Sequence, residues 1–211
     1  MKTSINNKPP EFKYNEYLII INPNQDTCDK INFEKKEFSE KYKTDLVYFN
    51  PHILMVKFLH LEMIEERLLN QLRNISNGYQ AFQVKLKDFG SFPSHTIFIN
   101  VETQLQVRNL VTALKSVQRI MTLDKENKPH FLNNYYFNIA ARLLPWQYEK
   151  AWVEYSHRHF NASFIAEGFT LLKRPVENFS NGFQPKGSYK ILQRFKFMNL
   201  PVIAQQGELF I

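Results

Sequence analysis

The sequence has one cysteine, few glycines and no long hydrophobic run, and these shortages exclude several classes of protein. The only cysteine among 211 residues is Cys28, which excludes an internal disulfide and a cysteine-based metal cluster. The first twelve residues are polar and contain two consecutive prolines, unlike a signal peptide. No apolar run approaches the roughly 20 residues that a membrane span needs. We therefore expect a cytoplasmic protein without a membrane segment.

Several catalytic and metal-binding motifs are also missing. The sequence holds no glycine-rich phosphate loop, no His-Glu-x-x-His and no Gly-x-Ser-x-Gly, and its six histidines lack metal-ligand spacing. These absences argue against kinases, metalloproteases and serine hydrolases of the standard type. We expect neither a metal ion nor a cofactor.

The composition favours a folded protein with a basic surface. A hydrophobic content of 44% and an aromatic content of 15% suffice for one sizeable core, or for two small lobes that share one. The net charge of +7 favours polyanionic partners, because a basic surface raises the local concentration of phosphate groups. No basic run exceeds two residues, so the sequence does not indicate a disordered nucleic-acid arm.

The hydrophobic periodicity predicts alternating strands and helices. The predicted strands are 17–22, 52–58, 82–89, 96–101, 135–143, 160–166, 169–173 and 189–197. The predicted helices are 25–42, 61–75, 105–121 and 146–155. We expect a loop over 124–134 and a turn or long hairpin loop over 176–187. This gives one two-lobed domain over 17–197, between a polar extension over 1–16 and a tail over 198–211.

A repeated order of predicted elements suggests that the two lobes are related by a pseudo-twofold axis. The strand that begins at His52, the helix after it and strand 82–89 parallel a second series of strand, helix and strand. The second series begins at Phe137 and ends with strand 160–166. Such symmetry would place the first strands of the two series beside each other across a groove, where we expect the functional site.

The order of elements and several short segments resemble a known family. These segments are YLIIINP, PHILMVKF, SHTIFINV, FNIAARL followed by PWQYEKAW, and TLLKR. From about Tyr17 to Phe197 the chain resembles the 2′-5′ RNA ligase and cyclic phosphodiesterase group of the two-histidine phosphoesterases. The resemblance implies an α+β bilobal fold with two antiparallel-sheet lobes related by a pseudo-twofold, helices outside and a central groove.

In that family each lobe supplies a His-x-Thr or His-x-Ser motif on a strand. One imidazole takes a proton from the attacking group, the other protonates the leaving oxygen, and the hydroxyls hold the phosphoryl oxygens. The first motif here keeps its histidine as His52, while Leu54 stands at the threonine position. His52 is therefore the one candidate catalytic residue that the resemblance supplies.

The second motif has lost its titratable group. The alignment places Phe137 at the histidine position and Ile139 at the threonine position. A shift of one residue places Asn138 and Ala140 there instead. In either register neither a phenyl ring nor an amide can shuttle a proton near neutral pH. Loss of one general acid or base typically costs about 10²- to 10⁴-fold in rate, so the resemblance predicts a catalytically impaired relative.

Other side chains near the inferred groove are candidates for binding a ligand. Basic residues there could hold an anion, and aromatic residues could stack on a base. The candidates for ligand binding are Lys57, His95, Tyr136, Phe137, Arg142 and Lys173. His95 and Thr96 are adjacent, so we expect them to point to opposite faces of a strand.

Three functions are compatible with the sequence. The first is a degenerate phosphoesterase-like protein that binds RNA or a phosphorylated nucleotide in the groove. The second is an active cyclic phosphodiesterase or other phosphoester hydrolase that pairs His52 with a substitute such as His95 or Tyr136. The third is a protein-interaction scaffold whose groove is filled by Phe137 and Ile139. The sequence does not indicate an oligomeric state.

Overall fold

The structure is a computed structural model that describes residues 12–44, 50–179 and 182–200. The strands are β1 (Tyr14–Ile21), β2 (Ile53–Leu61), β3 (Phe82–Phe92), β4 (Thr96–Val101), β5 (His130–Phe131), β6 (Tyr136–Ala141), β7 (Asn161–Ala166), β8 (Gly168–Phe179), β9 (Gly182–Pro185) and β10 (Lys190–Lys196). The α-helices are α1 (Gln25–Tyr42), α2 (Glu65–Asn77), α3 (Gln104–Leu114), α4 (Gln118–Met121) and α5 (Pro145–Tyr155). Two 3₁₀ turns, η1 (Glu62–Ile64) and η2 (Lys115–Val117), lead into α2 and α4.

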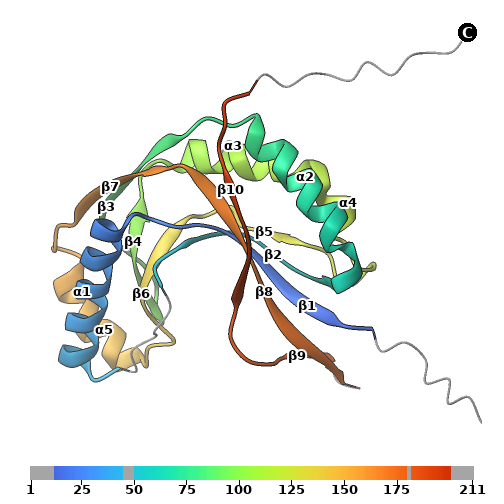
Figure 1. The fold of residues 1–211 in the computed structure, drawn as a ribbon. Coiled ribbons are helices and arrows are strands. Elements are labelled where there is room, and N and C mark those ends of the chain that lie inside the picture. Colours follow the sequence, from blue (N-terminus) through green and yellow to red (C-terminus); the bar gives the residue numbers. More distant parts are fainter. Residues whose placement is uncertain (1–11, 45–49, 180–181, 201–211) are drawn as a thin grey trace, which may run out of the picture.

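The strands form two antiparallel sheets. Sheet A has the strand order β10-β8-β1-β2-β5, and β9 pairs with β8. Sheet B has the order β6-β4-β3-β7. Helices α1 and α5 lie together beside sheet B, whereas α2, α3 and α4 gather beside sheet A (Figure 1). The predicted α+β class with two antiparallel sheets is confirmed.

The two sheets are related by the expected pseudo-twofold, but one pair of equivalent strands differs from the prediction. Strands β8-β1-β2 of sheet A correspond to β3-β4-β6 of sheet B, so the motif strands β2 and β6 are equivalent as expected. Strand 82–89 was matched with 160–166, yet β3 and β7 pair with each other in the same sheet. The counterpart of β3 is therefore β8. Sequence periodicity identifies strands but does not show which sheet each one joins.

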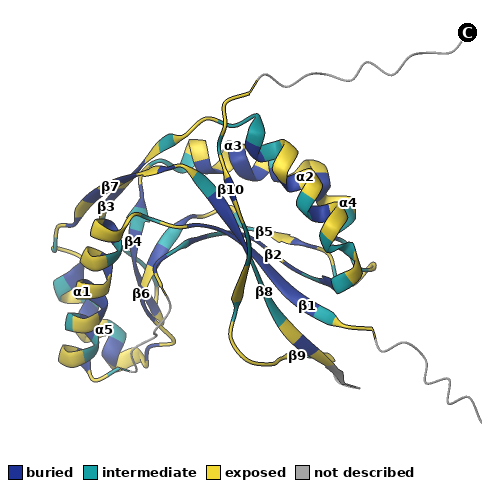
Figure 2. Cartoon of the chain, viewed as in Figure 1, coloured by how far each residue is buried: buried dark blue, intermediate teal, exposed yellow. Residues whose placement is uncertain are grey.

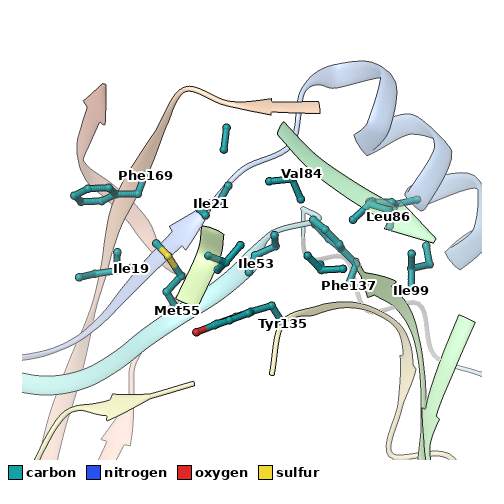
Figure 3. Packing of buried hydrophobic residues seen from close by; sticks show 14 of the residues in the cluster. Ile19, Ile21, Ile53, Met55, Val84, Leu86, Ile99, Tyr135, Phe137 and Phe169 are labelled. Carbon is teal, nitrogen blue, oxygen red and sulfur yellow. The ribbon is translucent and has the colours of Figure 1, made fainter. Parts of the chain in front are cut away.

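One continuous hydrophobic cluster joins both lobes. It includes Ile21 and Ile53 from sheet A and Val84, Ile99 and Phe137 from sheet B, all at most 1% exposed. These side chains converge where the two sheets approach each other (Figure 3). The central strands are buried along most of their length, while the outer faces of the helices are exposed (Figure 2). The two lobes therefore share one hydrophobic core.

Several boundaries differ from the sequence prediction because pairing decides them. β1 begins at Tyr14, inside the predicted polar extension, since Tyr14 pairs with Leu61 at the far end of β2. Because Leu61 is paired in β2, α2 begins at Glu65 and not at Leu61 as predicted. The expected loop over 124–134 contains the short strand β5, which pairs with β2, and the helix expected over 105–121 is interrupted by η2. The segment 176–187, predicted as a turn or long hairpin loop, instead contains the end of β8 and the strand β9, which pair with each other. No helix in the described ranges is both long and apolar enough to cross a membrane.

The close approach of β8 and β10 at Gly168 gives a test of this architecture. A methyl group added at Gly168 would lie 2.0 Å from the carbonyl oxygen of Phe195. Since backbone cannot move aside as a flexible side chain can, we expect Gly168→Ala to destabilise the fold by about 1–3 kcal/mol in urea unfolding. Gly187→Ala is the comparison, because its added methyl meets no atom within 4 Å and only its φ of +77° is strained. Equal stability of Gly168→Ala and the wild type would contradict the pairing of β8 with β10.

Candidate functional site: a pocket between the two motif strands

A pocket of about 300 Å³ lies where β2 of sheet A and β6 of sheet B face each other. Its polar lining residues are Lys35, Asn50, His52, Asn134, Tyr136, Asn138 and Tyr189. Its apolar lining residues are Leu18, Pro51, Leu54, Leu132, Phe137, Ile139, Ala140 and Ala141. The two motif segments predicted from the sequence therefore meet in one pocket.

His52 occupies the first motif position and contributes its imidazole to the pocket. Its Nδ1 lies 2.8 Å from the carbonyl oxygen of Asn50. Because a carbonyl oxygen can only accept a hydrogen bond, Nδ1 carries the proton, and the neutral ring has its lone pair on Nε2. Burial lowers the pKa of His52, and the positive charge of Lys35 lowers it further, against the opposing effect of the bond to Asn50. Two residues on, Leu54 lines the same pocket in place of a hydroxyl side chain.

The alternation of β6 decides which side chains of the second motif can reach a ligand. Phe137 is 1% exposed, lies in the hydrophobic cluster and contacts the edge of the Phe164 ring. Asn138, the next residue, is exposed and lines the pocket. Successive side chains on a strand point to opposite faces, so the burial of Phe137 directs Asn138 to the pocket side. Phe137 and Ile139 still border the pocket because β6 is an edge strand of sheet B, on the side of the pocket.

Tyr136 is the aromatic side chain that best fits a stacking role. It is partly exposed, lines the pocket, and packs against Phe98 and Phe92 at ring-centroid distances of 4.7 and 5.2 Å. Burial raises the pKa of its phenol. These contacts hold the ring in one position, and a fixed aromatic ring is a platform on which a base can stack. Phe137 has little exposed surface to offer for the same purpose.

The basic candidates do not converge on the pocket. Lys57 extends from β2 to Glu16 at 2.5 Å, and Arg174 donates to the same carboxylate. Although burial alone raises the pKa of Glu16, hydrogen bonds from Lys57, Tyr189 and Arg174 leave that pKa below its ordinary value. Arg142 is exposed just beyond the end of β6, with a left-handed φ of 58°. None of these three cations is among the residues that line the pocket.

Lys173 lies on the opposite face of sheet A from the pocket, which corrects its placement in the groove. Its ammonium binds Glu62 at 3.0 Å and Glu65 at 2.9 Å, and Glu65 also accepts from the hydroxyl of Tyr17. Glu62 and Glu65 belong to η1 and α2, which cover the outer side of the sheet. The sequence did not reveal this, because neighbouring residues on a strand differ in which face they occupy.

His95 lies outside the pocket. It is exposed in the turn before β4, and its Nδ1 lies 2.6 Å from the hydroxyl of Thr96. The expectation that His95 and Thr96 point apart was therefore wrong, because His95 precedes the strand and its ring turns back. As a substitute partner for His52, it is poorly placed.

The sequence prediction missed Lys35, Tyr189 and Asn134 as pocket residues. Lys35 left a signal, since it falls on the apolar stripe of α1 between Ile31 and Phe38, where a charged residue is unexpected. Tyr189 and Asn134 lie in connecting segments, whose positions depend on tertiary contacts. In the part of the chain that the structure describes, no group of three or more His, Cys, Asp or Glu side chains is placed to hold a metal ion.

Comparison with solved structures places this architecture in the class of two-lobed phosphoesterase folds. The crystal structure of E. coli LigT complexed with 3′-AMP matches with a TM-score of 0.57 at 15% identity, over 89% of this chain and 99% of that chain. LigT complexed with phosphate matches with a TM-score of 0.52 at 16% identity, over 88% and 98%. A crystal structure of a phosphoesterase matches with a TM-score of 0.51 at 15% identity, over 86% and 98%.

The family follows from the sequence. The family model of the 2′-5′ RNA ligase superfamily matches residues 34–178. The chain therefore belongs to the 2′-5′ RNA ligase superfamily, as the resemblance of its motif segments indicated. A search of the curated proteins found no match.

The register of β6 can be tested by two neighbouring substitutions. Phe137→Ala removes a fully buried ring and should lower the free energy of unfolding by about 3–5 kcal/mol. Asn138→Ala changes an exposed side chain and should alter it by no more than about 0.5 kcal/mol. Urea unfolding measures both. Similar losses in the two variants would mean that Phe137 is not the residue that anchors β6 in the core.

The lowered pKa of His52 predicts how stability depends on pH. The unfolded chain takes up a proton on His52 near the ordinary pKa of 6.5, whereas the folded chain resists protonation until a lower pH. Stability that is present above pH 6.5 should therefore be lost as the pH falls. His52→Gln should remove up to about 1.4 kcal/mol of this loss per pH unit, measured by urea unfolding between pH 7.5 and 5. His60→Gln is the comparison: burial also lowers the pKa of His60, so this variant should reduce the loss of stability in the same direction. An unchanged pH dependence in His52→Gln would contradict this assignment.

Proposed function

We propose that this protein is a catalytically degenerate member of the superfamily that binds RNA or a phosphorylated nucleotide in the pocket between β2 and β6. The observation that carries the proposal is that one histidine, His52, and one amide from the second motif segment, Asn138, line the same pocket. The amide of Asn138 can donate to phosphate oxygens, and His52 can donate to them from Nε2 when its ring is protonated, but an amide cannot act as the second acid or base.

The open volume of the pocket favours a ligand-binding function over a scaffold whose groove is filled by side chains. Its volume of about 300 Å³ is at the lower end of the range for small-molecule sites, which suits one nucleotide or the end of an RNA strand. Tyr136 supplies an aromatic face at one wall, and Asn134 and Asn138 supply amides. That E. coli LigT was crystallised with 3′-AMP and with phosphate adds support from a relative of the same fold.

An active phosphodiesterase is the second candidate, and one observation favours it. Tyr136 lines the same pocket as His52, so a titratable partner is present. Burial raises the pKa of Tyr136, however, which moves it further from the range in which a general acid or base works best at neutral pH. The binding function therefore remains our proposal.

Turnover and binding can be measured on the same protein. We expect no detectable cleavage of 2′,3′-cyclic AMP or of RNA that ends in a 2′,3′-cyclic phosphate. We expect 3′-AMP at about 100 times its dissociation constant to stabilise the fold by about 2.7 kcal/mol, which raises Tm by roughly 5–11 °C. His52→Ala should weaken 3′-AMP binding about 10- to 100-fold, because a bound phosphate favours the protonated imidazole, whose Nε2 then donates a hydrogen bond to a charged group.

The control is His130→Ala, which removes an exposed histidine from β5 and should leave both measurements unchanged. Turnover that disappears in His52→Ala would replace the binding proposal with a rewired enzyme. The absence of both turnover and a Tm shift would leave the interaction scaffold.

A further inference from the structure

The two motif strands carry the same irregularity, and it shows how the residues of the two lobes correspond. In sheet A, the pairing of β1 with β2 skips Met55, so that Leu54 and Val56 lie opposite consecutive residues of β1. In sheet B, the pairing of β4 with β6 skips Ile139 in the same way. A β-bulge is a built-in feature of a strand, so Met55 and Ile139 mark the same point in the two lobes.

The partner strands β1 and β4 support this correspondence by their sequences. Residues 19–22, at the end of β1 and just after it, read IIIN, and residues 97–100 of β4 read IFIN. In both lobes the register shifts between the first and the second residue of this segment. The two bulges therefore lie opposite the same position of a repeated sequence.

Counting back from each bulge matches three pairs of residues: Asn138 with Leu54, Phe137 with Ile53, and Tyr136 with His52. The middle pair, Phe137 and Ile53, is 1% and 0% exposed, and Figure 3 shows both among the core side chains. The other two pairs line the pocket, as the alternation of a strand requires. This register differs from the two that the sequence offered, which placed Phe137 or Asn138 at the histidine position.

Tyr136 therefore brings a hydroxyl group to the position that corresponds to His52. The hydroxyls of three other buried tyrosines, Tyr17, Tyr42 and Tyr135, donate to acceptors of the protein. The pKa of Tyr136 is raised by burial, with no contribution from a hydrogen bond to a described residue. Because a partly buried phenol normally has a hydrogen-bond partner, a ligand in the pocket is a suitable acceptor.

We propose that Tyr136 is the counterpart of His52 in the second lobe, and that its hydroxyl and the amide of Asn138 donate hydrogen bonds to the phosphate group of the ligand. This inference rests on the proposed function and names the groups that hold the phosphate from sheet B. The ring of Tyr136 forms a wall of the pocket, and the hydroxyl at its end adds a polar contact. A phenol with a raised pKa keeps its proton at neutral pH, so the contact serves binding and not proton transfer.

The correspondence also shows what each lobe has kept of the His-x-Thr pattern. The first lobe keeps the imidazole of His52 and has the apolar Leu54 at the position of the hydroxyl residue. The second lobe has Tyr136 and Asn138 at the two positions, and both side chains are hydrogen-bond donors. The second lobe thus retains the ability to hold phosphate oxygens, while the ability to exchange a proton near neutral pH is lost.

The test removes a single oxygen atom. Tyr136→Phe deletes the hydroxyl and keeps the ring in contact with Phe98 and Phe92, so urea unfolding should show an intact fold. Tyr79→Phe is the control, because Tyr79 is a partly buried tyrosine outside this pocket and burial raises its pKa as well. Asn138→Ala removes the second donor from an exposed position. Isothermal calorimetry with 3′-AMP, inorganic phosphate and adenosine measures the dissociation constants.

Tyr136→Phe and Asn138→Ala should each weaken the binding of 3′-AMP and of inorganic phosphate about 10- to 100-fold, because each loses a hydrogen bond to a charged group. Both should leave adenosine binding within about 3-fold of the wild type. Tyr79→Phe should bind all three compounds as the wild type does.

Two results would overturn the inference and leave the proposed function intact. One is wild-type affinity of Tyr136→Phe for 3′-AMP, which would limit Tyr136 to its ring. The other is an equal loss of 3′-AMP and adenosine binding in Tyr136→Phe, which would mean that the hydroxyl does not contact the phosphate. No binding of 3′-AMP by the wild type would instead overturn the proposed function, and this inference with it.

Discussion

The burial of Phe137 fixes the register of β6, and the chemistry of the pocket depends on that register. With Phe137 packed among core side chains from both sheets, strand alternation turns Tyr136 and Asn138 toward the groove. A shift of one residue would exchange these faces and expose the ring to water. The core thus gains a large apolar side chain, and the second motif presents a phenol and an amide to the groove, but no imidazole.

Most of the cations predicted near the groove are paired with carboxylates of the protein. Lys57 and Arg174 share the carboxylate of Glu16, and Lys173 is bound to two glutamates of η1 and α2 on the far face of the sheet. These pairs neutralise the strand cations locally, so a basic residue near the groove in sequence does not by itself indicate a ligand contact. Lys35, which comes from helix α1, is the lysine among the described residues that line the pocket.

The comparison with E. coli LigT shows that the fold tolerates large changes in sequence. The two chains align over most of their length at 15% identity. Such conservation of fold requires that apolar positions, strand order and helix packing persist, whereas individual polar positions in the groove are free to change. Membership of the superfamily therefore describes the scaffold. The side chains that this chain presents in the pocket, His52, Leu54 and Asn138 among them, are its own.

The sequence by itself determined the α+β class, most of the strands and helices, and the family. These features depend on local periodicity and on short segments, which can be read without knowledge of distant contacts. Only the tertiary structure decided that β3 is equivalent to β8, that Phe137 is buried while Asn138 faces the pocket, and that Lys173 lies on the outer face. It alone brought Lys35 to the site, because the meeting of a helix with an edge strand depends on how the two sheets pack and not on any pattern along the chain.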